Sequence, residues 1–168
     1  MKTVSVEHEY SQGLEEVYAA FRNPDFYIAK FEGIGDRNVQ VLDHGEDDDG
    51  FWIEIDRDVP ADVPGILKKF MGEWNSMGQT ENWSEDDDGY HNELELQTRG
   101  VPLDISGKMF LTGDDSGCVN RVVMYLKSNV PLLGGQLEKF GAVRTQEGLD
   151  AEYDFIRDYL DSGVELNA

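Results

Sequence analysis

Three short acidic segments, each with at least one glycine, limit most strongly what this chain can fold into. They are Glu46–Gly50, Glu85–Gly89 and Gly113–Gly117, and each lies between two runs of alternating apolar and polar residues. Aspartate tolerates left-handed backbone angles and glycine has no Cβ to clash, so both favour the tight turns of β-hairpins. Three hairpins in series predict an antiparallel meander.

The runs around these turns alternate with a period of two, which is typical of strands with one apolar and one polar face. The predicted apolar faces carry Val4, Val6, His8 and Tyr10; Phe51, Ile53 and Ile55; Tyr90, Asn92, Leu94 and Leu96; Ile105, Met109 and Leu111; Val122, Met124 and Leu126. Weaker patterns at Val39, Val41 and residues 79–83 supply the remaining strands. The sequence therefore predicts about seven antiparallel strands.

Two regions have helical spacing instead. After the first strand, Ser11 is expected to cap one short helix, and a second is expected from Asp25 to Phe31, after a proline that suits a first helical turn. The longest helix is predicted from about Gly135 to Tyr159 or Leu160, at the C-terminal end of the chain.

Gly141 and Gly148 lie inside this long helix, where a glycine costs up to about 1 kcal/mol. A close approach of the helix to the sheet, a molecule bound beneath it, or a kink would each explain them.

Together these elements predict a single α+β domain over residues 1–168, with the sheet curved around the C-terminal helix. A curved sheet of this size cannot fill its concave side with its own side chains, so the helix must lie across it. A helix packed on a sheet whose ends open leaves room for a pocket.

The junction between the last strand and the long helix, Val130–Phe140, is the most distinctive segment of the chain. Together with Gly100-Val101-Pro102, Trp74 and Trp83, it resembles the bacterial domain-of-unknown-function 2505 family, within the START-like (SRPBCC) superfamily that has the helix-grip fold of the birch-pollen allergen. The resemblance implies this fold over nearly the whole chain. It also implies an apolar or amphipathic ligand, such as a lipid, isoprenoid or polyketide, held under the long helix. Some members of the superfamily are cyclases, and the narrower family supplies no catalytic residues to carry over.

The charge of the chain argues against several kinds of partner. Thirty-five acidic against 14 basic side chains give a formal net charge of −21, which repels nucleic-acid phosphates and anionic lipid head groups. No stretch approaches the roughly 20 apolar residues that span a bilayer, so no stable membrane insertion is expected. The N-terminal residues lack the apolar core of a secretory signal, so we expect a cytoplasmic protein.

The sequence contains no motif for a cofactor, a metal or a catalytic nucleophile. The single Cys118 excludes an internal disulfide and adjoins a turn, which favours a structural role. Gly33-Ile34-Gly35 does not continue into a dinucleotide fingerprint, because Asn38 takes the place of its last glycine. The three histidines fall on different elements, which argues against a metal site. We therefore expect neither cofactor nor metal.

The apolar faces and the long helix supply a candidate ligand-binding set: His8, Ile53, Ile55, Tyr90, Asn92, Leu94, Leu96, Met109, Met124, Leu126, Leu137 and Phe140. Four polar residues on these faces, His8, Tyr90, Asn92 and Asn120, are notable because burying an unpaired polar group costs roughly 1–3 kcal/mol. Each is expected to be paired internally, to be hydrated, to lie near a strand end, or to face a ligand.

A segment between the third and fourth predicted strands carries four apolar residues on one side of a short turn: Ile66, Leu67, Phe70 and Met71. This side is expected either to close the core or to form a lid over the mouth of a pocket.

Three functions fit these patterns. The first is a module that binds or carries a small apolar or amphipathic molecule between sheet and helix. The second is a cyclase or dehydratase that uses His8 or Tyr90 as an acid–base group in the same cavity. The third is a protein-interaction domain with a fully packed core and a working acidic surface.

Overall fold

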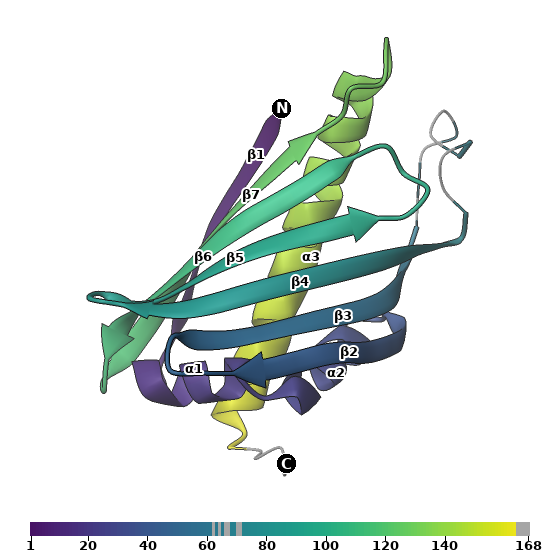
Figure 1. The fold of residues 1–168 in the computed structure, drawn as a ribbon. Coiled ribbons are helices and arrows are strands. Elements are labelled where there is room, and N and C mark those ends of the chain that lie inside the picture. The colour runs from purple at the N-terminus through teal and green to yellow at the C-terminus, as the bar shows by residue number, and fades with distance from the viewer. Residues whose placement is uncertain (62, 64, 66–67, 70–71, 164–168) are drawn as a thin grey trace.

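A curved seven-stranded antiparallel sheet wraps around one long helix (Figure 1). The computed structural model describes residues 1–61, 63, 65, 68–69 and 72–163. The strands are β1 (Lys2–Tyr10), β2 (Arg37–Glu46), β3 (Gly50–Pro60), β4 (Trp74–Asp86), β5 (Gly89–Thr98), β6 (Asp104–Asp114) and β7 (Gly117–Lys127). The helices are α1 (Leu14–Phe21), α2 (Pro24–Gly33) and α3 (Gly134–Asp161). This order of elements confirms the predicted fold.

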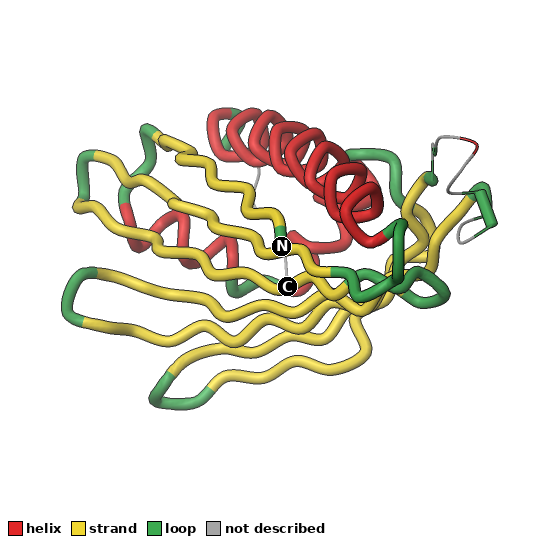
Figure 2. The backbone as a smooth tube through the Cα atoms, turned by 90° about the horizontal axis from the view of Figure 1, so that it is seen from above, coloured by secondary structure: helices red, strands yellow, loops and turns green. Residues whose placement is uncertain are grey.

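The sheet order is β1-β7-β6-β5-β4-β3-β2. Every pair from β2 to β7 is consecutive in the chain, as a meander requires, and β1 closes the far edge by pairing with β7. Seen from above, α3 lies along the concave face of the sheet (Figure 2). The helices α1 and α2 lie at one end of the sheet (Figure 1).

The three acidic segments are hairpin tips, as predicted. In each, one aspartate side chain accepts a hydrogen bond from the backbone N–H group of a residue two or three positions later in the chain. Asp47 Oδ1 accepts from Asp49 and Gly50. The corresponding bonds at the other two tips join Asp86 to Asp88 and Gly89, and Asp114 to Ser116. These three aspartates therefore have a local structural role at the turns.

The start of α1 differs from the prediction. The residue that precedes the helix is Gly13 rather than Ser11, and no side chain caps it. A Cβ at Gly13 would lie 2.9 Å from the backbone oxygen of Asp115, so α1 begins where the chain passes close to the β6–β7 turn. The second helix follows the expected pattern, because Asn23 Oδ1 accepts from the N–H of Asp25.

The core has two parts. Beneath α1, α2 and the C-terminal half of α3, aromatic and branched side chains pack densely: Tyr10, Val17, Tyr18, Phe21, Phe26, Tyr27, Phe31, Phe51, Ile53, Ile55, Trp83, Tyr90, Leu111, Cys118, Ile156 and Leu160. The other part consists of Val4, Leu94, Leu103, Ile105, Val122, Met124, Leu126 and Leu149. Met109 packs against both parts and lies at their boundary.

The two glycines inside α3 have different surroundings. A Cβ at Gly141 would lie 2.6 Å from Cδ2 of Leu103 and 2.9 Å from Cδ2 of Leu126, so the helix passes close to these buried side chains. A Cβ at Gly148 would meet nothing within 4 Å. Close packing therefore accounts for Gly141, and open space faces Gly148.

This contrast gives a first prediction. Gly148→Ala is expected to raise the free energy of unfolding by about 0.5–1 kcal/mol, because alanine is the better helix former and has room. Gly141→Ala is expected to lower it by about 1 kcal/mol, because overpacking at a crowded core position outweighs the same helix gain. Urea unfolding followed by circular dichroism measures both, and equal gains at the two sites would contradict the contrast.

Candidate ligand-binding site

A cavity of about 300 Å³ lies between α3 and the strands β3 to β7. Its volume is at the lower end of the range for small-molecule sites. The apolar part of its wall consists of Ile34, Val59, Pro60, Ala61, Met77, Leu94, Leu96, Val101, Leu103, Ile105, Met109, Met124, Leu137, Phe140, Leu149 and Ala151. Gly148 also belongs to the wall, so the open space in front of this glycine is the cavity itself.

Six of the predicted ligand-binding residues line this cavity: Leu94, Leu96, Met109, Met124, Leu137 and Phe140. They come from four elements, β5, β6, β7 and α3. The alternation of the strands and the apolar stripe of the helix bring them to one space. Their role as ligand contacts stays a prediction.

Five other predicted residues line neither this cavity nor the smaller chamber beside it. Ile53 and Ile55 are fully buried in the aromatic part of the core, and Leu126 packs beside Gly141. The hydroxyl of Tyr90 donates to Glu15, and its ring stacks on Tyr18 at 3.5 Å between ring centroids.

Asn92 is fully buried and paired, since its Nδ2 donates to Glu81 and its Oδ1 accepts from the N–H of Asn82. Internal pairing therefore explains both Tyr90 and Asn92. These five side chains are correctly placed on the inner face, but packing or pairing occupies them.

The predicted lid residues Ile66, Leu67, Phe70 and Met71 lie outside the described residues. Pro60 and Ala61, which precede these residues in the chain, are described and form part of the cavity wall.

A buried polar network borders the cavity on the inner face of β4. Glu81, 1% exposed, is its centre. Its Oε1 accepts hydrogen bonds from the hydroxyl of Tyr27 at 3.0 Å, from Trp83 Nε1 at 2.9 Å and from Asn92 Nδ2 at 2.9 Å. Its Oε2 accepts from Gln79 Nε2. Four donors converge on one carboxylate, which explains how this acid is accommodated inside the sheet.

The network continues to a buried ion pair. Gln79 Oε1 accepts from Arg57 Nη1 at 2.7 Å, and Arg57 Nε lies 2.9 Å from Asp36 Oδ2. Burial raises the pKa of Asp36 to about 6, although the neighbouring Arg57 guanidinium opposes this shift. Burial also lowers the pKa of Arg57, again against the effect of its partner. Asp36, Arg57 and Gln79 all line the large cavity.

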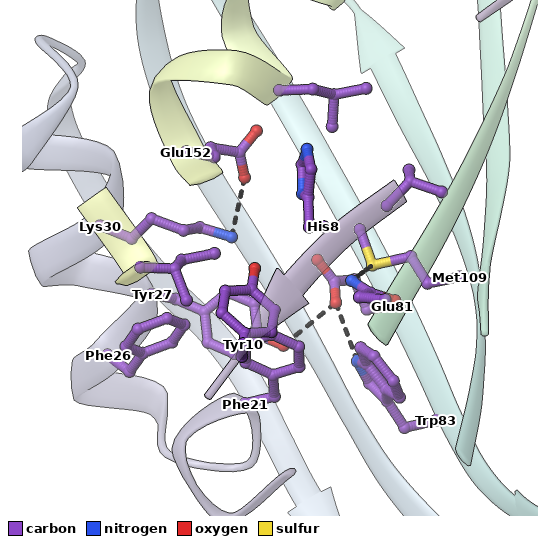
Figure 3. Close-up of a pocket in the computed structure, with 14 residues that line it drawn as sticks. His8, Tyr10, Phe21, Phe26, Tyr27, Lys30, Glu81, Trp83, Met109 and Glu152 are labelled. Carbon is purple, nitrogen blue, oxygen red and sulfur yellow. Dashed lines mark hydrogen bonds and ion pairs between the residues drawn. The ribbon is translucent and has the colours of Figure 1, made fainter. Parts of the chain in front are cut away.

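A second, much smaller chamber of about 30 Å³ adjoins the large cavity, and Figure 3 shows its lining. His8 and Tyr10 of β1, Lys30 of α2 and Glu152 of α3 are among its wall residues. Lys30 Nζ lies 2.9 Å from Glu152 Oε1. The ring of His8 stacks on Tyr153 with 4.3 Å between centroids, and burial lowers the pKa of His8. Burial therefore favours the neutral imidazole of His8, although the nearby carboxylate of Glu152 opposes this shift of the pKa.

The described residues include no group of three or more His, Cys, Asp or Glu side chains that could hold a metal ion. Burial raises the pKa of the Cys118 thiol to about 11, which disfavours the reactive thiolate. None of the described helices is both long and apolar enough to cross a membrane.

Sequence reasoning missed the charged and polar members of the site: Asp36, Arg57, Gln79, Glu81 and Glu152. A signal for three of them was present. Arg57 lies two residues after Ile55, on the same face of β3 as Ile53 and Ile55. Gln79 and Glu81 lie on the same face of β4 as Trp83.

Known proteins resemble this chain in two ways: a family model matches its sequence, and solved structures share its fold. The family model described as Protein of unknown function (DUF2505) matches residues 5–160. No curated protein matches the sequence. A solved structure from Thermus thermophilus aligns with a TM-score of 0.67 at 13% identity, covering 98% of this chain and 100% of that one.

Two further structures carry functional or superfamily names. The ZhuI aromatase/cyclase of a Streptomyces species aligns with a TM-score of 0.66 at 10% identity, over 98% of this chain and 96% of that one. A START superfamily protein of Mycobacterium smegmatis aligns with a TM-score of 0.59 at 12% identity, over 94% and 98%. At such identities the likeness concerns the helix-grip fold, whereas the family model concerns the sequence itself. The chain therefore belongs to the family of proteins of unknown function DUF2505.

Proposed function

We propose that this protein binds a small apolar or amphipathic molecule in the 300 Å³ cavity between α3 and the sheet. The observation that carries the proposal is a space with a mainly apolar wall beneath α3, about ten times larger than the chamber in the aromatic part of the core. Protein cores contain few voids larger than a water molecule, so a space of this size points to an occupant. The fold shared with an aromatase/cyclase and a START superfamily protein supports the same reading.

The composition of the wall supports an apolar body for the ligand. Side chains such as Leu94, Met124 and Phe140 offer contact area but no hydrogen bonds. Removing apolar surface of a ligand from water against such a wall contributes about 25 cal/mol per Å². Met109 and Met124 also adapt their shape readily, because methionine is unbranched and flexible.

Filling the cavity from the helix tests this proposal. Gly148→Leu would project a side chain into the open space, so it is expected to weaken binding of the uncharged fluorescent probe N-phenyl-1-naphthylamine at least about ten-fold, or about 1.4 kcal/mol. Fluorescence titration measures the dissociation constant.

Gly148→Ala is the matched control, because it makes the same change from glycine but fills little of the space. It should bind the probe as the wild type does. Neither variant should unfold at a lower temperature than the wild type, since both are better helix formers than glycine. A wild-type protein that fails to bind the probe, or a leucine variant that binds it equally well, would contradict the proposal.

A further inference from the structure

The small chamber beside the large cavity contains polar atoms that no protein group satisfies. The hydroxyl of Tyr10 and the Oδ1 atom of Asn120 are buried and have no hydrogen-bond partner among the described residues. Both residues line the chamber, and each is only 4% exposed. In Figure 3 the Tyr10 hydroxyl points toward the space between Lys30 and His8. An orphaned buried polar atom costs roughly 1–3 kcal/mol, so two around one small space indicate a missing polar occupant.

The size of the chamber restricts this occupant. A volume of about 30 Å³ holds one or two water molecules, or a functional group of similar size. The chamber is not isolated, because Met109, Leu149 and Glu152 line both it and the large cavity. Met109 is the flexible member of this partition, so we expect a change of the Met109 rotamer to let a ligand in the large cavity reach the chamber.

The charges of the wall restrict the occupant further. Glu81 and Glu152 are anionic groups, and Lys30 is a cation held between Glu152 and three aromatic rings. A carboxylate or phosphate would meet two carboxylates, and an ammonium would meet Lys30. An ion of either sign would also lose its hydration in this enclosed space. A neutral group avoids both costs.

The wall of the large cavity also favours a neutral end group on the ligand. Each arginine in its described wall already contacts a carboxylate: Arg57 pairs with Asp36 at 2.9 Å, and Arg144 with Glu147 at 3.0 Å. An anionic end group would therefore compete with an existing partner for either cation.

We infer that the chamber binds a neutral hydroxyl group at the end of an otherwise apolar ligand. A hydroxyl can accept a hydrogen bond from Tyr10 and donate one to Asn120 Oδ1, whereas a carbonyl oxygen can only accept. The inference rests on the proposed function, because the apolar body of the ligand lies in the large cavity. It adds the class of ligand: an apolar alcohol or phenol, in preference to an acid, a phosphate ester or an amine.

Four naphthalene probes with different end groups test this selectivity. They are 2-naphthol, 2-methylnaphthalene, 2-naphthoate and 2-naphthylmethylammonium, titrated into the intact protein at pH 7.5 by calorimetry. We expect 2-naphthol to bind at least about ten-fold more tightly than the other three. A charged probe that binds as tightly as 2-naphthol would overturn the inference.

Two variants localise the hydroxyl. Tyr10→Phe and Asn120→Leu each remove one orphaned atom, and each is expected to weaken 2-naphthol binding about five- to ten-fold while 2-methylnaphthalene binding is unchanged. Tyr10→Phe should unfold at the same or a higher temperature than the wild type, because it removes a hydroxyl without a partner. Tyr125→Phe is the matched control on the opposite face of β7, and it should leave all four affinities unchanged.

The outcomes separate the two proposals. If 2-naphthol and 2-methylnaphthalene bind equally and neither chamber variant changes their affinities, the chamber holds only water and the hydroxyl inference is wrong, while the apolar site stands. If none of these probes binds, and N-phenyl-1-naphthylamine does not bind either, the proposed function itself fails.

Discussion

Replacing Glu81 with leucine is expected to lower the free energy of unfolding by at least about 4 kcal/mol. The substitution removes the acceptor shared by Tyr27, Trp83, Asn92 and Gln79, all of which donate to it from buried positions. Each buried donor left without a partner costs roughly 1–3 kcal/mol. Because a typical domain is stable by only 5–15 kcal/mol, the variant would be partly unfolded under mild conditions. Urea unfolding followed by far-ultraviolet circular dichroism measures the loss.

Two controls accompany this variant. Glu81→Gln keeps one oxygen acceptor but turns an amide N–H toward another donor, so it should lose a smaller amount, about 1–2 kcal/mol. Glu95→Leu makes the same change as Glu81→Leu on the exposed face of β5, and it should change stability by no more than about 0.5 kcal/mol. Equal losses for Glu81→Leu and Glu95→Leu would show that the network contributes little.

Arg57→Met is expected to cost about 3–5 kcal/mol at pH 8, because it leaves the buried carboxyl group of Asp36 without its cation. The loss should depend on pH. In the wild type the pKa of Asp36 is about 6 in the folded state, against an ordinary value of 3.8, and removing Arg57 raises it further. Below about pH 5 the carboxyl group is protonated in both folded proteins, so the loss is smallest there.

As the pH rises through 6 toward 8, the wild type ionises Asp36 beside Arg57, while the folded variant must keep the proton or bury an unpaired charge. The difference between the two proteins therefore grows with pH. The double variant Arg57→Met with Asp36→Leu removes both charges and should recover most of the loss, since a buried ion pair can often be replaced by apolar side chains. Urea unfolding at pH 5 and pH 8 measures these differences, and a loss independent of pH would contradict this account.

The sequence predicted the fold well because its signals are local. A hairpin turn needs only a few adjacent residues, and at Asp47 and Asp86 the same side chain that marks the turn also satisfies its backbone. The strands between the turns keep strict alternation, so their inner faces could be predicted residue by residue. The start of α1 could not, because the close approach of Gly13 to Asp115 joins segments about 100 residues apart.

The candidate site was only partly predictable, because alternation gives the direction of a side chain but not what it meets. Ile55 and Leu94 are both on the inner face, yet one is packed in the aromatic core and the other lines a cavity. The charged residues on the same faces were overlooked, since a carboxylate such as Glu81 is acceptable inside a sheet only when its donors come from other elements. Those donors become visible only in three dimensions.

The core is divided at Met109, and this division separates two demands that are usually in conflict: a stable fold and a cavity whose wall can change. The aromatic half adjoins the chamber of about 30 Å³ and contributes most of the buried aromatic side chains, whereas the cavity of about 300 Å³ lies against the other half. The hollow half can then exchange one apolar side chain for another of different size without losing the fold. Over evolutionary time, members of such a family could acquire new ligand preferences by small steps in one half while the other half keeps the protein folded.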